Sequence, residues 1–246
     1  MRKNYLPLNQ NFLQQNVAHR GLHSNAVIEN SMQAFALAIE GGFGIEIDVH
    51  LLTDGEIAVV HDSNLKNVTG QDVVVEELSS ADLEKYPLLL GGGKIPTLRE
   101  TLAFIDGRAP LLIEMKFGKE FDKKQVDAVL AQLQGYAHKD KIALQSFDPR
   151  AVRYCKKKSS AYSVGFLATY HISRGKLLTY LCKSLSWLGW MRADFISYDI
   201  NFLPNRYVNK KRKKGYQVLA WTVDTQEKLR KAAQVADNII FENIQP

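Results

Sequence analysis

The sequence predicts an α/β fold in which eight parallel strands and the helices between them close into a (β/α)8 barrel. Eight short apolar runs, rich in β-branched residues, recur along the 246 residues. Between successive runs, apolar residues repeat at helical spacing. Polar residues also gather where the runs end, which is where such barrels carry their sites. An open doubly wound sheet is the alternative, but no glycine fingerprint follows the first expected strand.

The expected strands are short and evenly distributed along the chain. They lie near residues 17–18, 45–49, 111–115, 142–144, 162–167, 195–198, 217–223 and 238–241. The first helix begins at Asn30 or Ser31, either of which can cap it, and Gly41 ends it. Its apolar residues follow the i, i+3, i+4, i+7 pattern of a helix packed on one face.

The later helices show the same periodicity. Their apolar stripes fall within residues 98–105, 126–133, 177–188 and 229–236. Pro149 at a first helical position starts the helix after the fourth strand, and Pro204 is expected to start a basic helix that Gly215 ends. The sequence stops at Pro246, so we expect no full helix after the eighth strand.

One stretch interrupts the alternation of strands and helices. After the second barrel strand, residues 53–55 form a turn and residues 57–60 a further short strand. The following residues, up to about 96, have no regular periodicity. We therefore expect one domain, residues 1–246, with a small subdomain inserted at about residues 53–96.

Two acids on the second strand indicate a cation site. Side chains two apart in a strand point to the same face, so Glu46 and Asp48 project together. Two buried carboxylates repel each other unless a cation or a proton lies between them. Glu114, at the end of the third strand, supplies a third carboxylate. Oxygen ligands favour Mg²⁺ or Ca²⁺, and also suit Mn²⁺.

Other polar side chains occupy the ends of separate strands. They are His19, Arg20, His61, Lys116, Gln145 and Trp221. Arg20 and Lys116 can offset the carboxylates and hold a phosphate, and imidazole suits proton transfer near neutral pH. Each residue alone has a structural explanation, such as a surface ion pair or a hydrogen-bonded histidine. Together they favour a catalytic site.

At these residues the sequence resembles the glycerophosphodiester phosphodiesterase family. The matching segments are Ala18-His19-Arg20-Gly21, Glu29-Asn30-Ser31, Glu46-Ile47-Asp48-Val49, Thr53-Asp54-Gly55, Val59-Val60-His61-Asp62, Pro96-Thr97-Leu98, Ile113-Glu114-Met115-Lys116 and Ala220-Trp221-Thr222-Val223. They follow the family order through most of the chain, whereas residues 150–215 carry little of the family pattern. Asp224 and Phe241-Glu242-Asn243 depart from that pattern, and we expect them to affect the substrate pocket but not the metal or histidine positions.

The resemblance implies a TIM barrel with an inserted subdomain. It also implies a divalent metal on Glu46, Asp48 and Glu114, with His19 and His61 as the acid–base pair. Arg20 and Lys116 then contact the phosphate, and we add Gln145 and Trp221 as substrate contacts.

The implied reaction is metal-dependent hydrolysis of a glycerophosphodiester to glycerol 3-phosphate and an alcohol. The resemblance suggests attack by the glycerol 2-hydroxyl through a cyclic phosphate. Two alternatives remain. The first is lysophospholipase D-type hydrolysis on the same barrel, for which the leucines at 88–90 or the aromatic helix at 176–190 would contact an acyl chain. The second is a non-catalytic barrel that binds phosphodiesters.

The remaining features concern partners and location. The net charge is +6 and two basic runs, residues 156–158 and 210–214, end predicted helices, where they suit the helix dipole. We interpret them as solvated surface on the face away from the site, with an anionic membrane as the alternative partner and no nucleic acid. The first sixteen residues contain no apolar core of a signal peptide, and only two cysteines occur, so we expect a cytoplasmic protein.

Overall fold

The computed structural model describes residues 5–118, 120–170 and 183–246. Its strands are β1 Val17–Ala18, β2 Gly44–Leu51, β3 Ile57–Val59, β4 Leu111–Met115, β5 Ile142–Ser146, β6 Ser163–Ala168, β7 Phe195–Asp199, β8 Gln217–Val223 and β9 Asn238–Phe241. Its α-helices are α1 Asn11–Gln14, α2 Met32–Glu40, α3 Lys66–Thr69, α4 Leu98–Ile105, α5 Lys123–Gln134, α6 Pro149–Lys158, α8 Leu188–Met191, α9 Arg206–Arg212 and α10 Gln226–Val235. Short 3-10 turns lie at Val75–Glu77, Ser80–Lys85, Leu89–Gly91, Lys139–Lys141 and Ile200–Phe202.

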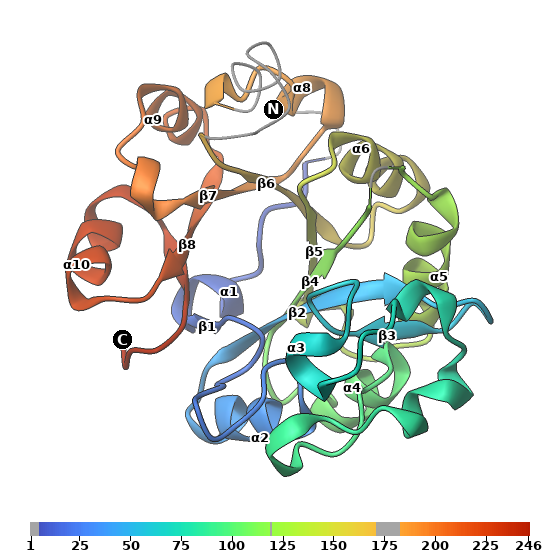
Figure 1. Ribbon diagram of the computed structural model, residues 1–246. Helices are drawn as coiled ribbons and strands as arrows, with labels where there is room; N and C mark the ends of the chain where they lie inside the picture. The colour runs from blue at the N-terminus through green and yellow to red at the C-terminus, as the bar shows by residue number, and fades with distance from the viewer. Residues whose placement is uncertain (1–4, 119, 171–182) are drawn as a thin grey trace.

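Eight of these strands form a closed parallel barrel (Figure 1). Strand β1 pairs with β9 on one side and with β2 on the other, which closes the ring. The larger helices lie outside the strands (Figure 1). The closed barrel predicted from the sequence is therefore confirmed, and the open-sheet alternative is wrong.

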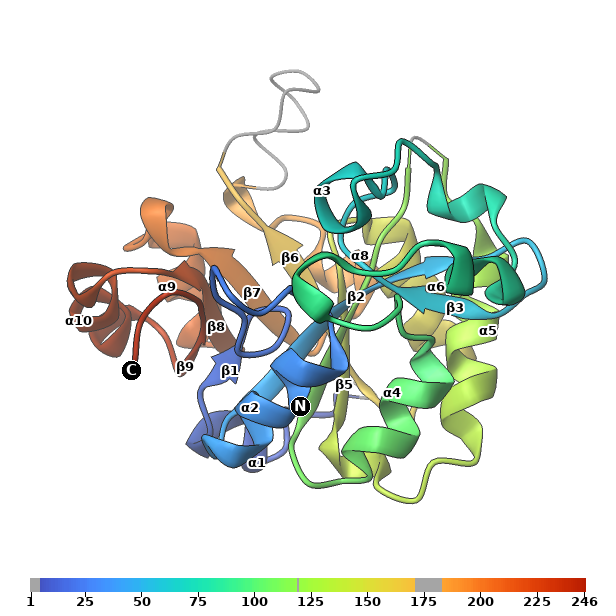
Figure 2. The ribbon, with the colours of Figure 1, turned by 60° about the horizontal axis from the view of Figure 1, so that its bottom comes forward.

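Between β2 and α4 the chain adds a hairpin and irregular turns. Strand β3 pairs antiparallel with β2 and is not part of the barrel. The segment that follows has its own small hydrophobic cluster, which includes Leu65, Val75 and Leu83. Figure 2 shows α3 of this segment near the top and α1 near the bottom, so they lie toward opposite ends of the barrel. We interpret this segment as the inserted subdomain.

The interior of the barrel has an apolar layer and a polar layer. The apolar layer contains Val17, Leu112, Ala143, Phe195, Leu219 and Ile240, with Leu8 and Phe12 from the N-terminal segment. Two residues further along four of these strands, on the same face, stand Glu114, Gln145, Ser197 and Trp221. The apolar layer thus supports a polar layer at the carboxyl ends of the strands.

Gly165 makes room for an aromatic ring inside the barrel. A Cβ atom at this position would lie 2.2 Å from the ring of Phe195. Phe195 is fully buried in the apolar layer and is the β7 partner of Gly165. A larger residue at 165 would therefore displace the Phe195 ring from the apolar layer of the barrel.

The N-terminal segment is tied beneath the barrel by polar contacts. The side-chain amide of Asn238 donates to the carbonyls of Phe12 and Gln15, each at 2.7 Å. Asp194 accepts from the backbone N–H of Leu6 at 3.0 Å and from that of Val164 at 2.9 Å. These contacts hold residues 6–15 against the amino ends of the strands, away from the polar layer.

The interpretation of the basic run 156–158 as solvated surface is wrong for Lys156. Its side chain is 2% exposed, and its Nζ lies 2.7 Å from Asp194 Oδ2, whose side chain is 1% exposed. Lys157 and Lys158 are exposed. The helix turns Lys156 inward, where it neutralises a carboxylate that also holds the N-terminal segment.

We expect Lys156→Met to destabilise the fold by about 3–5 kcal/mol, because it leaves the buried Asp194 carboxylate without its cation. Urea unfolding followed by circular dichroism measures the change in the free energy of unfolding. Lys157→Met removes a positive charge from the exposed neighbouring position and should change it by less than about 0.5 kcal/mol. Equal effects of the two substitutions would contradict a structural role for the buried pair.

Smaller differences from the sequence predictions concern helix boundaries. The basic helix begins at Arg206, capped by Asn205, so Pro204 precedes the helix. Most of the predicted leucine-rich helix at 177–188 lies outside the described residues. In the described part, residues 183–184 and Leu188–Met191 are helical, with a turn between them. Residues 242–246 form no helix. Among the described residues, no helix is both long and apolar enough to cross a membrane.

Candidate active site

Three buried carboxylates meet inside the barrel. Glu46 and Asp48 alternate with apolar residues along β2, and Asp48 lies in register with Glu114 on the neighbouring strand β4. All three side chains are buried. One oxygen from each lies within 4.8 Å of the others. The structure therefore brings together the three acids that the sequence predicts as ligands.

A tight loop after β1 places Arg20 over these acids. Arg20 and Gly21 both have positive φ, at 56° and 78°, and a Cβ at residue 21 would lie 2.8 Å from that of Ala34. The Arg20 backbone N–H donates to Glu46 at 3.1 Å, and its Nε lies 3.3 Å from Asp48 Oδ2. Position 21 therefore requires glycine, because of its positive φ and because a Cβ would clash with Ala34. The turn directs the backbone N–H and the guanidinium of Arg20 toward the carboxylates.

Glu29 and Asn30 fix this loop. Glu29 accepts two hydrogen bonds from one guanidinium nitrogen of Arg20, at 2.8 and 2.9 Å. The Asn30 side chain donates to Asp48 Oδ2 at 3.1 Å, and its backbone N–H donates to the Arg20 carbonyl at 2.9 Å. Asn30 thus connects the turn to the second strand.

Lys116 lies between two of the acids. Its Nζ is 2.6 Å from Glu114 Oε1 and 3.0 Å from Asp48 Oδ1. Burial alone would raise the pKa of Asp48, but Lys116 and Arg20 outweigh it and hold this pKa well below its ordinary value. Burial would lower the pKa of Lys116, and Asp48 and Glu114 reverse this and raise it. Asp48 and Lys116 are therefore charged.

The other two acids hold unfavourable negative charge. Burial, with added repulsion from Asp48 and Glu114, raises the pKa of Glu46 well above its ordinary value. Burial also raises the pKa of Glu114 to about 7. Glu46 Oε1 is buried and has no hydrogen-bond partner among the described residues. Three acids against two cations leave one negative charge when all are ionised, so the donor set fits one additional cation.

His19 and its carboxylate partner come from the two strands that close the barrel. Its Nδ1 donates to Glu242 Oε2 at 2.6 Å, since β1 pairs with β9 and residue 242 directly follows β9. The hydrogen bond from His19 holds the pKa of Glu242 well below its ordinary value. With Nδ1 occupied, Nε2 is the nitrogen left for a substrate.

His61 has a carboxylate partner of the same kind. Its Nδ1 lies 2.7 Å from Asp62 Oδ1. Burial, opposed by the charge of Asp48, lowers the pKa of His61 below its ordinary value. The charges of both His61 and His19 contribute to the lowered pKa of Asp48. Both predicted histidines therefore lie close enough to the carboxylate cluster for their charges to act on Asp48.

His50 supports the backbone at His61. Its Nε2 lies 3.0 Å from the His61 carbonyl, and its Nδ1 lies 2.7 Å from Glu76 Oε1. The two contacts, one on each ring nitrogen, fix the orientation of the imidazole. Glu76 belongs to the inserted segment, which is thereby linked to the histidine loop.

The two predicted substrate contacts Gln145 and Trp221 lie on β5 and β8. Gln145 is in register with Glu114, and its side-chain oxygen accepts from Ser197 at 2.7 Å. The Trp221 ring packs edge-on against Phe147, with ring centroids 5.4 Å apart. Trp221 Nε1 is buried without a partner among the described residues. Gln145 is thus engaged within the protein, whereas Trp221 retains an unused donor.

Sequence reasoning missed several residues of this site. It assigned no role to Glu29 or Asp62, and it considered Asn30 only as a helix cap. The expectation that position 242 stands apart from the histidines is wrong, because Glu242 lies on His19. The contact between Glu242 and His19 could have been predicted from closure of the barrel, because closure makes the carboxyl ends of the first and last strands neighbours.

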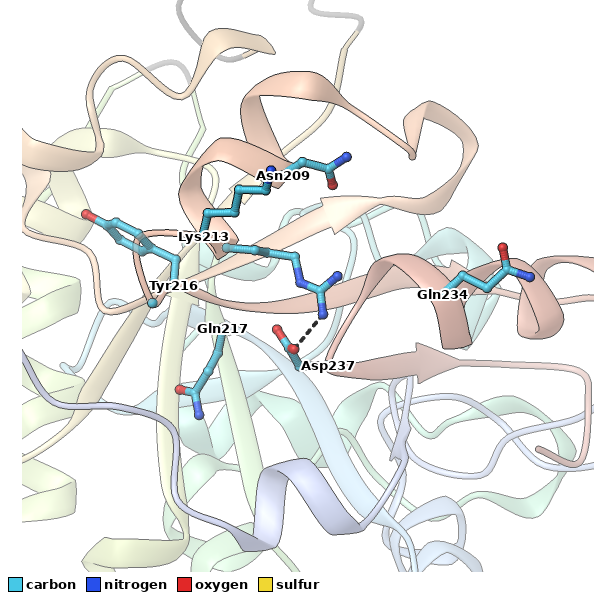
Figure 3. Close-up of a pocket in the computed structure, with 8 residues that line it drawn as sticks. Asn209, Lys213, Tyr216, Gln217, Gln234 and Asp237 are labelled. Carbon is cyan, nitrogen blue, oxygen red and sulfur yellow. Dashed lines mark hydrogen bonds and ion pairs between the residues drawn. The ribbon is translucent and has the colours of Figure 1, made fainter.

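A separate cavity of about 660 Å³ lies at the opposite end of the barrel (Figure 3). It opens between the last turn of α9, the start of β8 and the residue before β9. Arg212, from the second basic run, pairs there with Asp237 at 2.8 Å, and Asp237 also accepts from the Val218 backbone. The second basic run therefore lies on the face away from the carboxylates, as the sequence predicts.

Comparisons with known proteins agree with this architecture. The sequence matches the Glycerophosphoryl diester phosphodiesterase family over residues 19–244. It is 28% identical to a glycerophosphodiester phosphodiesterase of Caldanaerobacter subterraneus, covering 92% of this chain and 93% of the relative. It is 27% identical to a mouse lysophospholipase D, covering 88% of this chain and 71% of the relative.

A solved structure shows the same fold. The crystal structure of glycerophosphodiester phosphodiesterase from Thermotoga maritima superimposes with a TM-score of 0.73 at 27% identity, covering 93% of this chain and 94% of that chain. The family match includes every residue of the candidate site, from His19 to Glu242. The chain therefore belongs to the glycerophosphoryl diester phosphodiesterase family.

Proposed function

We propose that this protein hydrolyses glycerophosphodiesters to glycerol 3-phosphate and an alcohol, with a divalent cation bound by Glu46, Asp48 and Glu114. The observation that carries the proposal is the convergence of three buried carboxylates, two basic side chains and two histidines at the carboxyl ends of the strands. Family membership supports the same reaction class. The alternative of a non-catalytic, phosphodiester-binding barrel does not explain why these side chains converge.

The chemistry of the donors fits Mg²⁺ or Ca²⁺, with Mn²⁺ also suited. All ligand atoms are carboxylate oxygens, and Glu46 Oε1 is a buried acceptor without a partner among the described residues. When bound, the cation supplies positive charge that draws electron density from the phosphoryl oxygens. No histidine belongs to this oxygen set, so both remain available for proton transfer.

Arg20 and Lys116 bind and orient the phosphate. Both are charged groups held by carboxylates at the site, and both are partly exposed, with 18% of each side chain accessible. Their remaining donors can reach an oxyanion that enters from the open end of the barrel. Trp221 Nε1 adds a neutral donor, and the ring beside Phe147 covers one wall.

The two histidines move the protons. One imidazole accepts the proton of the attacking oxygen, and the other, as its protonated form, donates to the oxygen of the departing alcohol. Glu242 and Asp62 hold the Nδ1 atoms, which leaves the Nε2 atoms for these transfers. Attack by water breaks the P–O bond to the alcohol and gives glycerol 3-phosphate, with the first histidine left protonated and the second neutral. Attack by the glycerol 2-hydroxyl breaks the same bond but leaves a cyclic phosphate, which water then opens with the two histidines in exchanged roles.

Removal of the divalent cation is expected to abolish activity. Without it, the phosphate would meet a site whose acids leave net negative charge. We expect at least a 100-fold loss of glycerol 3-phosphate formation from glycerophosphocholine after dialysis against EDTA, with recovery on addition of Mg²⁺ or Ca²⁺. A coupled glycerol 3-phosphate assay provides the measurement. Full activity after exhaustive chelation would remove the cation from the proposal.

Lysophospholipase D activity is the second candidate. Leu89 and Leu90, in the inserted segment, are 44% and 57% exposed, and exposed leucines can contact an acyl chain. A mouse relative is named for that activity. A panel of glycerophosphocholine, glycerophosphoethanolamine, glycerophosphoglycerol and a lysophospholipid, each with Mg²⁺, Ca²⁺ and Mn²⁺, separates the candidates. Faster turnover of the lysophospholipid, lost in Leu90→Ser, would favour the second.

A further inference from the structure

A second group of metal-ligating side chains lies beside the carboxylate cluster. One ring nitrogen each of His19 and His23 and a carboxylate oxygen of Glu242 all lie within 4.8 Å of one another. His19 Nδ1 lies 2.6 Å and His23 Nε2 3.6 Å from Glu242 Oε2. His23 comes from the loop after β1, and Glu242 follows β9. These three ligands, which we call the His–His–Glu cluster, share no residue with the oxygen site.

The cluster is open enough for an ion to enter. The side chains of His19 and His23 are each 16% exposed, and that of Glu242 is 25% exposed. His23 Nε2 has no hydrogen-bond partner among the described residues, although it lies 3.6 Å from Glu242 Oε2. The Nε2 atom of His23 is thus near the Glu242 carboxylate but too far from it for a hydrogen bond.

These distances suit a small tetrahedral ion. Zinc ligands lie about 2.0–2.2 Å from the metal, so two ligands of a tetrahedral site are separated by roughly 3.3–3.5 Å. The 3.6 Å between His23 and Glu242 is close to that value. The 2.6 Å between His19 Nδ1 and Glu242 would need to open by less than about 1 Å. Two imidazoles and one carboxylate also form a known ligand set of zinc, with a fourth position for water.

We propose that the His–His–Glu cluster binds Zn²⁺, separately from the oxygen site, and that zinc bound there inhibits the enzyme. Imidazole ligands suit Zn²⁺ and other transition metals, whereas all-carboxylate sites suit Mg²⁺ or Ca²⁺. Binding releases the proton that His19 Nδ1 shares with Glu242. The two sites therefore differ in ligand chemistry, and each can be loaded in the presence of the other.

Inhibition follows from the tautomer of His19. A metal ion on Nδ1 takes the lone pair of that nitrogen and leaves the remaining ring proton on Nε2. Nε2 then has no free lone pair to accept a proton, and loss of its own proton would leave an imidazolate, so His19 serves neither as base nor as acid. Glu242 also no longer orients the ring through a hydrogen bond. This consequence depends on the proposed role of His19, whereas zinc binding by the cluster does not.

Binding is tested without any activity measurement. Full-length protein in millimolar Mg²⁺ is titrated with Zn²⁺ by calorimetry, and with Co²⁺ by visible absorption, in which nitrogen-ligated tetrahedral cobalt gives intense bands. His23→Ala is expected to weaken Zn²⁺ binding roughly tenfold or more and to remove the cobalt bands. His138→Ala, which removes an imidazole 41% exposed beside Asp106, serves as the matched control and should leave both unchanged. Equal Zn²⁺ affinity in the wild type and His23→Ala would overturn the site.

Inhibition is tested on the same proteins with glycerophosphocholine and Mg²⁺. His23→Ala should keep the basal rate and need at least about tenfold more Zn²⁺ for half inhibition than the wild type or His138→Ala. Inhibition that is equal in all three proteins would overturn the inhibitory role. If none of the proteins hydrolyses the substrate, the proposed function fails, while the calorimetric result still decides the zinc site.

Discussion

His19→Ala and His61→Ala should each lower the turnover number by roughly 10²–10⁴-fold, the usual contribution of a positioned acid or base. Each imidazole has its Nδ1 on a carboxylate, so each ring presents Nε2 in a fixed tautomer. Alanine removes the proton-transfer group and leaves the cation ligands and the phosphate-binding side chains intact. The loss should therefore appear in kcat much more than in KM.

The measurement is steady-state hydrolysis of glycerophosphocholine with saturating Mg²⁺. His138→Ala, far from the carboxylates, is the control and should retain wild-type kcat. The double variant should lose little more than the worse single variant, because the two histidines act in one reaction sequence and such effects are not additive. Unchanged kcat in both single variants would show that these histidines do not transfer the protons.

Residual activity in the single variants has an informative pH dependence. Burial lowers the pKa of His61, which favours its neutral form near neutral pH. The pKa values of Glu242 and Asp62 are both lowered, so each histidine has an ionised carboxylate on its Nδ1. We therefore expect His61 to act as the base at rest, so that the residual activity of His19→Ala falls as the pH is lowered and His61 becomes protonated.

Periodicity predicted those parts of the structure that depend on local pattern. Alternation along residues 45–49 placed Glu46 and Asp48 on one face, and the rule that barrel sites lie at the carboxyl ends of strands brought Glu114 to them. Closure of the barrel then carried His19 to the same end. These predictions needed only the order of the elements and the pleat of a strand.

Contacts between distant segments could not be predicted in the same way. Lys156 belongs to a basic run, and nothing local indicates that its helix turns it toward Asp194, 38 residues later. Asn30 matches the usual cap of a helix, whereas its positive φ of 51° and its bond to Asp48 depend on the loop packing around it. Glu242 became a partner of His19 only through the register of β9 with β1. Side-chain partners of this kind follow from three-dimensional packing.

The substitution Glu46→Gln is expected to change stability in opposite directions with and without the cation. In the metal-free protein, burial and the neighbouring acids raise the pKa of Glu46, and they raise that of Glu114 to about 7, so ionisation of these groups opposes folding. A glutamine keeps an oxygen that can accept from the Arg20 N–H and removes one negative charge. The metal-free variant should therefore unfold at a higher urea concentration than the metal-free wild type.

The pH dependence of this difference has a definite sign. A carboxyl group with a raised folded-state pKa stabilises the protein below its unfolded value, here about 4.5, and loses that contribution as the pH rises through the folded value. The metal-free wild type should thus lose stability relative to Glu46→Gln as the pH rises above about 4.5. Glu77→Gln, at an exposed position, is the matched control and should show no such trend.

With added Mg²⁺, the wild type should become more stable than Glu46→Gln. A ligand at one hundred times its dissociation constant stabilises the folded state by about 2.7 kcal/mol. The wild type and Glu77→Gln should gain this amount, whereas Glu46→Gln should gain little and should also lose hydrolysis. Were the Mg²⁺-dependent stabilisation equal in Glu46→Gln and wild type, Glu46 would not be a ligand. The repulsion among the three buried acids favours a cation at this site, because either a proton or a bound cation is needed to relieve it, and a proton becomes scarcer as the pH rises.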